Sequence, residues 1–106
     1  MGSFCNSRAV VSFFREKSMD VSIICSGRIG EQVVEDNLCA EYFKHCFDSP
    51  NEKFRLTENE IADACLSSPS YKMLASAGLD GDFAKCMSID SHGIVPVLAG
   101  DGFILL

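Results

Sequence analysis

The pattern of apolar and polar positions predicts a helix at the start of the chain and a buried strand after it. Within residues 2–17, the apolar positions of 9–14 are spaced for one helical face. Residues that commonly cap helices precede them, and basic residues, which suit a helix carboxyl end, follow. Residues 20–25 (DVSIIC) are short, β-branched and almost wholly apolar. This composition predicts a buried strand of a parallel sheet.

A second helix is predicted after a glycine-containing loop at residues 26–31. Two acidic residues, Glu35 and Asp36, open this helix, where the helix dipole favours negative charge. The apolar stripe that follows has helical spacing and consists of Leu38, Cys39, Tyr42, Phe43, Cys46 and Phe47. Pro50 ends it, so this is the clearest amphipathic helix of the chain.

The second half of the chain predicts three shorter helices and a hairpin. Thr57 and Glu60 form a capping box that opens one helix, Ser68-Pro69 opens the next, which ends at Gly78, and Asp80 opens the third. Two apolar runs, 94–98 and 103–106, flank a glycine-rich turn. The expected fold is a single α/β domain over residues 1–106. Its small, mostly parallel sheet is flanked by helices, forms half of a larger α/β/α fold and ends in a C-terminal β-hairpin.

Composition narrows the class of protein. The chain has 106 residues and a net charge of −6, and residues 56–106 hold two basic residues against seven acidic ones. Nucleic-acid binding depends on clustered Lys and Arg, so no nucleic-acid partner is expected. No apolar run approaches the roughly 20 residues of a membrane helix, so no membrane partner is expected either. The six cysteines show no CxxC or zinc-finger spacing, and no signal-peptide pattern opens the chain. A reduced, cytoplasmic protein is expected.

One constellation of residues could carry chemistry. Gly27, Arg28 and Gly30 follow the predicted strand, at the edge where ligands bind in open α/β sheets. Glycine lets the backbone approach an anion, and arginine can bind two phosphate or sulfonate oxygens. Glu35 and Asp36 could offer carboxylate oxygens to Mg²⁺. The same residues also fit a plain strand-to-helix turn whose acids compensate the helix dipole, and spacing alone leaves both interpretations open.

No complete catalytic set is visible in the sequence. Cys25, at the end of the predicted strand, could be a nucleophile, but a buried apolar thiol is the favoured interpretation. His45 is expected in solvent on a helix flank, and His92 in a loop. No phosphate-binding loop or nucleophile-elbow motif occurs.

Three stretches, taken together in this order and spacing, resemble the C-terminal half of the 2-phosphosulfolactate phosphatase family. The residues that carry the resemblance are Gly2-Ser3-Phe4-x-Asn6-x-x-Ala9-Val10; Cys25-Ser26-Gly27-x-x-Gly30 running to Glu35-Asp36-x-Leu38-Cys39-Ala40; and Ser68-Pro69, Leu74, Gly78, Asp82, Cys86, Asp90 and Val95-Pro96. Family members are roughly twice as long, and the Asp-Val-x-Arg-Ala-Thr and Thr-Asn-Gly-Thr stretches of their N-terminal half do not occur in this sequence.

The resemblance implies a Mg²⁺-dependent phosphatase, or a fragment of one. Such an enzyme hydrolyses 2-phosphosulfolactate to 3-sulfolactate and phosphate, on the route to coenzyme M. Its substrate is a small phosphorylated acid, Mg²⁺ is its cofactor, and Asn6 is a further candidate for contacting substrate. Partners would be a missing N-terminal half or a second copy of the chain. The alternative is a non-catalytic α/β module that binds an anionic metabolite or a protein partner.

Overall fold

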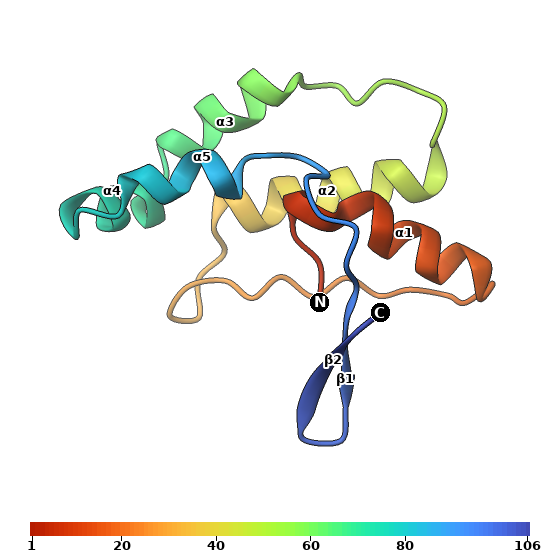
Figure 1. Cartoon of the computed structure of the whole chain (residues 1–106). Helices are drawn as coiled ribbons and strands as arrows, with labels where there is room; N and C mark the ends of the chain where they lie inside the picture. Colours follow the sequence, from red (N-terminus) through yellow and green to blue (C-terminus); the bar gives the residue numbers. More distant parts are fainter.

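Five α-helices, two short 3-10 helices and one β-hairpin make up the protein. The structure is a computed structural model that describes all 106 residues. In chain order the elements are η1 (Phe4–Asn6), α1 (Ser7–Glu16), α2 (Val34–Asp48), α3 (Glu58–Leu66), α4 (Pro69–Ser76), η2 (Asp80–Asp82), α5 (Phe83–Cys86), β1 (Pro96–Ala99) and β2 (Gly102–Leu105). The helices form one body, from which the hairpin projects (Figure 1). None of these helices has both the length and the apolar character needed to cross a membrane.

Helix α2 is the centre of the packing, because it contributes to both hydrophobic clusters. One cluster joins Leu38 of α2 to residues of η1 and α3 and consists of Phe4, Leu38, Ile61 and Cys65. The other joins Phe43 of α2 to α1 and to the segment before β1, and consists of Val10, Val11, Phe43 and Val95. The half-buried Cys39 packs against both clusters. The amphipathic stripe predicted for this helix is therefore confirmed as its packing face.

The signals at the ends of α3 and α4 are confirmed, whereas Asp80 does not cap α5: it lies in η2 and makes no capping hydrogen bond. The Thr57 hydroxyl accepts a hydrogen bond from the Glu60 N–H, and the Glu60 carboxylate accepts one from the Thr57 N–H. This is the reciprocal capping box, and it opens α3. Ser68 caps α4 by accepting from the Tyr71 N–H, and Gly78 follows that helix with φ +73°, the left-handed conformation that glycine favours.

The predicted C-terminal hairpin is also confirmed, but the prediction of a mostly parallel sheet is wrong. Strands β1 and β2 pair antiparallel, with Pro96 opposite Leu105 and Ala99 opposite Gly102. They form a two-stranded sheet, and no other strand joins it. A hairpin forms between neighbours in sequence, whereas a parallel pair needs a crossover connection between two strands. The fold is α/β only in the broad sense that helices accompany a small sheet.

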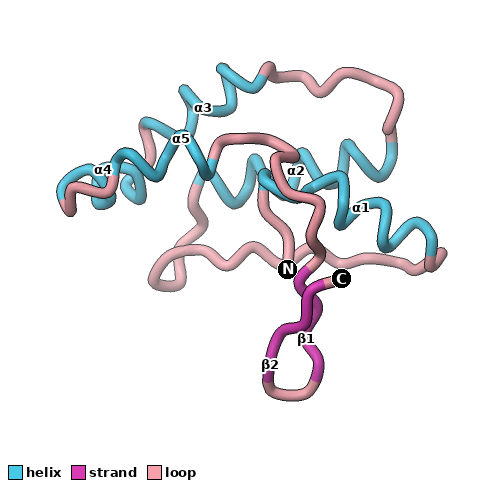
Figure 2. Tube along the Cα trace, in the orientation of Figure 1, coloured by secondary structure: helices cyan, strands magenta, loops and turns pink.

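The reason for this difference lies in residues 20–25, which do not form a strand. They run as part of the long loop between α1 and α2 (Figure 2) and make no backbone hydrogen bond to any other segment. Their apolar side chains are exposed rather than buried, and Ile24 is 90% exposed. The composition of this segment suits a central strand, but the chain supplies no strand for it to pair with.

Candidate functional site

The loop before α2 contains a tight bend at residues 26–31. Arg28 and Glu31 exchange two backbone hydrogen bonds of 2.9 Å, and the bend needs left-handed backbone at Gly27 and Gly30 (φ +67° and +75°). A Cβ atom added to Gly27 would lie 2.6 Å from the backbone oxygen of Glu31. Only glycine therefore fits at that position without moving the bend.

Asp36, in the first turn of α2, accepts hydrogen bonds from this bend. Its Oδ2 atom accepts a hydrogen bond of 2.6 Å from the Gly27 N–H and one of 3.3 Å from the Ser26 hydroxyl. Gly27, which the sequence analysis placed at an anion-binding loop, thus donates its N–H to a carboxylate of the chain. The N–H groups of Ile29 and Gly30 have no hydrogen-bond partner within the chain and remain available to a ligand.

Glu35 differs from Asp36, because one of its carboxylate oxygens is buried without any partner. Its Oε2 atom neither accepts a hydrogen bond nor joins an ion pair. The side chain lies near Cys65 of α3, where burial raises the thiol pKa to about 11 and the charge of Glu35 adds to the increase. A buried carboxylate oxygen without a donor is costly, and a bound cation would remove that cost.

The remaining members of the predicted constellation are only partly brought together. The Arg28 guanidinium turns towards α4, with Nη2 3.4 Å from the Met73 sulfur, and it forms no ion pair with Glu35 or Asp36. No group of three or more His, Cys, Asp or Glu side chains is placed to hold a metal ion. A Mg²⁺ ion held at this position would therefore rely on two carboxylates plus water and substrate oxygens, which is a common arrangement for Mg²⁺.

Asn6 lies within the chain's own hydrogen-bond network. It is 6% exposed, its Oδ1 atom accepts from the Ser3 N–H at 2.8 Å, and its Nδ2 group donates to the carbonyl oxygens of Met1 and Ile94. Both ends of its amide are thus hydrogen-bonded within the chain, and the bond to Ile94 links the N-terminus to the segment before β1. Its role in contacting substrate remains a prediction.

Asp90 is one of the residues that carry the family resemblance, and the sequence analysis assigned it no contact. It accepts a hydrogen bond of 2.7 Å from the Arg8 N–H and another from the Ser7 hydroxyl, and it forms an ion pair with the Arg8 guanidinium at 3.2 Å. These contacts place a carboxylate at the N-terminus of α1, where the helix dipole favours it. Asp90 is more than 80 residues from Ser7 and Arg8 along the chain, so no local sequence pattern could have revealed these contacts.

The cysteines differ in their surroundings. Burial, together with the charge of Asp36, raises the pKa of the Cys39 thiol to about 12. Cys25 was expected to be buried but is exposed, and its thiol lies 3.6 Å from the Asp36 backbone oxygen. No disulfide links any of the six cysteines. Cys39 is therefore a neutral thiol at neutral pH.

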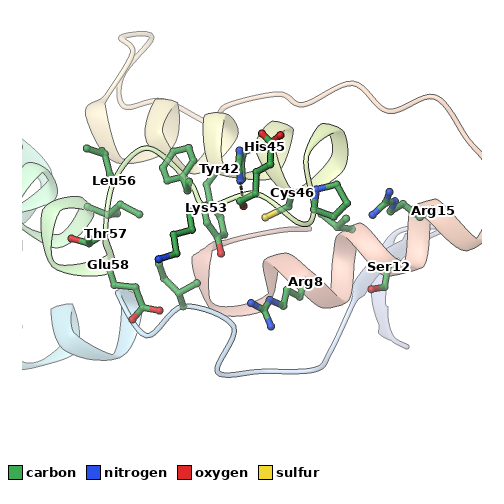
Figure 3. Close-up of a pocket in the computed structure, with 16 residues that line it drawn as sticks. Arg8, Ser12, Arg15, Tyr42, His45, Cys46, Lys53, Leu56, Thr57 and Glu58 are labelled. Carbon is green, nitrogen blue, oxygen red and sulfur yellow. Dashed lines mark hydrogen bonds between the residues drawn. The ribbon is translucent and has the colours of Figure 1, made fainter.

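A separate cavity of about 830 Å³ lies between α1, α2 and the loop that follows α2. Figure 3 shows Arg8, Ser12 and Arg15 in a row along α1, on one wall of the cavity. Their spacing of four and three residues puts them on one helical face, a signal that the sequence carried and that was not used.

The opposite wall of this cavity comes from α2 and the loop. It includes Tyr42, His45 and Lys53, and the His45 Nε2 atom is 2.8 Å from the backbone oxygen of Glu52 (Figure 3). Burial, followed by smaller effects of nearby charges, raises the pKa of Tyr42 to about 12, so its hydroxyl keeps its proton. Three Lys or Arg residues against two Glu residues line the cavity, in a chain that is acidic as a whole.

The structure therefore describes a helical α/β unit with two polar features: a bend closed by a carboxylate, and a cavity lined by three cations and two carboxylates. The chain belongs to the 2-phosphosulpholactate phosphatase family, whose sequence model matches residues 1–101. The resemblance found in its motifs is thereby confirmed.

Three curated relatives agree with this assignment. Each is described as a probable 2-phosphosulfolactate phosphatase. The relative from Clostridium acetobutylicum is 28% identical over 91% of this chain, that from Pseudothermotoga lettingae 29% over 95%, and that from Clostridium novyi 30% over 91%. The aligned regions cover 46%, 49% and 46% of these relatives, so the chain spans about half the length of the curated relatives it matches.

The hydrogen bonds of Asn6 lead to a prediction about stability. Replacing Asn6 by Ala leaves the Ser3 N–H and the Ile94 carbonyl without their partner, so the free energy of unfolding should fall by about 1–3 kcal/mol. The matched control is Asn37→Ala, since Asn37 is exposed and makes one long hydrogen bond of 3.4 Å. Chemical denaturation of both variants measures the difference. Equal stability of the two variants would contradict the structural role of Asn6.

Proposed function

We propose that this chain forms part of a phosphatase that hydrolyses a small phosphorylated acid, 2-phosphosulfolactate, to 3-sulfolactate and phosphate. The support is membership of the phosphatase family, together with one observation in the structure, the buried and unpartnered Oε2 atom of Glu35. The neighbouring Asp36 carboxylate lies against the glycine bend. Two acidic residues and a bend with two available N–H groups are suited to a phosphate ester and its cation.

The donor set fits Mg²⁺, because hard carboxylate oxygens are the ligands that this ion prefers. Glu35 and Asp36 would hold the ion, which when bound supplies positive charge that neutralises the phosphoryl oxygens. The proposed role of the chain is binding: the N–H groups of Ile29 and Gly30 donate to phosphate oxygens, and Arg28 pairs with the acidic group of the substrate. In the reaction, water adds to phosphorus and the alcohol leaves with a proton, so the products are an alcohol and phosphate.

Arg28 must change its rotamer for this role. Its guanidinium lies against the Met73 sulfur, a weak acceptor that competes poorly with an anion. Arginine gains far more from two charged oxygens than from a thioether. The proposed binding therefore includes a turn of this side chain from α4 towards the bend.

A second candidate function is the binding of an anionic metabolite without catalysis. The cavity between α1 and α2 favours it, because Arg15 and Lys53 line that cavity and form no ion pair within the chain. The aromatic ring of Phe54 also lines it, so the ligand would combine negative charge with apolar surface.

Magnesium binding gives the first test of the phosphatase proposal. Mg²⁺ at about 100 times its dissociation constant should raise the free energy of unfolding by roughly 2.7 kcal/mol. Glu35→Gln and Asp36→Asn each remove one carboxylate, and each should weaken Mg²⁺ binding at least about tenfold. Asp63→Asn is the matched control, since Asp63 is an exposed carboxylate on α3. Thermal melts with and without Mg²⁺ measure the shift. An equal shift in all four proteins would contradict the metal assignment.

Phosphate release from 2-phosphosulfolactate distinguishes the two functions. We expect Mg²⁺-dependent release that falls at least about tenfold in Glu35→Gln and is unchanged in the double variant Arg15→Ala/Lys53→Ala. The control for that double variant is Lys72→Ala, an exposed cation on α4. If no protein releases phosphate, and the double variant alone loses binding of inorganic phosphate, then the non-catalytic module is the correct interpretation.

A further inference from the structure

The apolar residues of the hairpin and of the loop before α2 lie largely on the surface. Leu98 and Phe103 of the hairpin are 64% and 58% exposed, and Ile24 of the loop is 90% exposed. We call residues 19–25 together with the hairpin and its C-terminal residue (96–106) the open β face. Exposed apolar residues that are contiguous mark interaction sites.

The open β face also has unpaired backbone. The two-stranded sheet has two free edges, because each strand pairs only with the other. Residues 20–25 make no backbone hydrogen bond to another segment. An isolated hairpin is only marginally stable in water, and natural proteins cover or pair such edges.

The two parts of the open β face meet at the start of the chain. The Met1 amino group donates to the Pro96 carbonyl oxygen, which places Met1 at the base of the hairpin. Met1 and residues 21–26 also line one groove of about 440 Å³, most of whose other lining is apolar, including Phe14 and Phe47. Figure 1 shows the loop passing close to the N-terminus, above the hairpin.

The chain exposes more surface than a compact monomer of its mass. A compact monomer of 11.6 kDa exposes about 5,800 Å², whereas this chain exposes 7310 Å². Its radius of gyration is 14.4 Å, against about 13 Å for a compact domain of this length. The excess of roughly 1,500 Å² is about twice what one partner buries in a standard protein–protein interface of ~800 Å². An excess of this size is typical of a permanent contact rather than a transient one.

We propose that the open β face docks a polypeptide equivalent to the part of the curated relatives that lies outside the match. The relatives are about twice as long as the region they share with this chain. That polypeptide supplies strands that pair with residues 20–25 and with the free edges of the hairpin. The proposal rests on family membership, not on the phosphatase chemistry, so each can fail without the other.

The test mixes this chain with the segment of the Clostridium novyi relative that lies outside the matched region. Analytical ultracentrifugation should show a one-to-one complex. Ile24→Lys and Phe103→Lys should each weaken it by at least about tenfold, since charge replaces a buried apolar contact. The control is Leu79→Lys, an apolar residue that is 49% exposed and lies outside the open β face. All three positions are exposed, and circular dichroism confirms that each variant keeps its helices.

Three results would overturn the proposal. The first is that the segment does not bind, and the second is that binding is as strong in Ile24→Lys and Phe103→Lys as in Leu79→Lys. The third is that the chain alone forms a dimer that these two variants abolish and that the added segment does not disrupt, which would make a second copy the occupant. Glu35→Gln should bind the segment as tightly as the unmodified chain, which separates this test from that of the metal site.

Discussion

A shortage of buried apolar surface governs this structure. Only eleven of the 106 residues are buried, and the eight apolar ones among them form two clusters of four that meet at α2. The chain is not short of apolar residues, since 47% of it is hydrophobic. Several β-branched residues that could fill a sheet core, together with Phe103, instead lie exposed on the hairpin and in residues 19–25. The helical part is thus a folded body, and the β part has the composition of a core without the neighbours that would bury it.

The candidate site depends on the same helix that holds the clusters together. The first turn of α2 places Glu35 near Cys65 of α3 and Asp36 against the glycine bend. The Asp36 carboxylate accepts hydrogen bonds from the chain, whereas the buried Oε2 atom of Glu35 has no partner. In the proposed function, Glu35 and Asp36 would hold the cation, while the free N–H groups of Ile29 and Gly30 in the bend would receive the phosphate group.

Short-range signals in the sequence were sufficient for the helices and the hairpin. The Thr57 capping box, the Ser68 cap and Gly78 each act within four residues, so the pattern alone placed these helix ends. Residues 20–25 show the limit of this reasoning. Their composition indicates a strand, but a strand exists only when another segment pairs with it, and pairing is a property of the rest of the fold.

The sequence likewise predicted only those contacts of the candidate site that lie within a short stretch of chain. The proximity of Gly27 and Asp36 follows from a short loop that enters a helix, and it could be inferred from spacing. The turn of Arg28 towards Met73 and the contact of Asp90 with α1 depend on the packing of distant segments. The spacing of Arg8, Ser12 and Arg15 was present in the sequence, but only the loop carrying Lys53 turns that helical face into a cavity wall.

The central claim is that the helical body folds while residues 20–25 form no backbone hydrogen bonds to another segment. Hydrogen–deuterium exchange of the isolated chain is its most direct test. The account predicts slow exchange for the amides of α2 and α3, and exchange of residues 20–25 close to the rate of an unstructured peptide. Protection of residues 20–25 equal to that of α2 would contradict it, because those amides would then already be paired in a sheet.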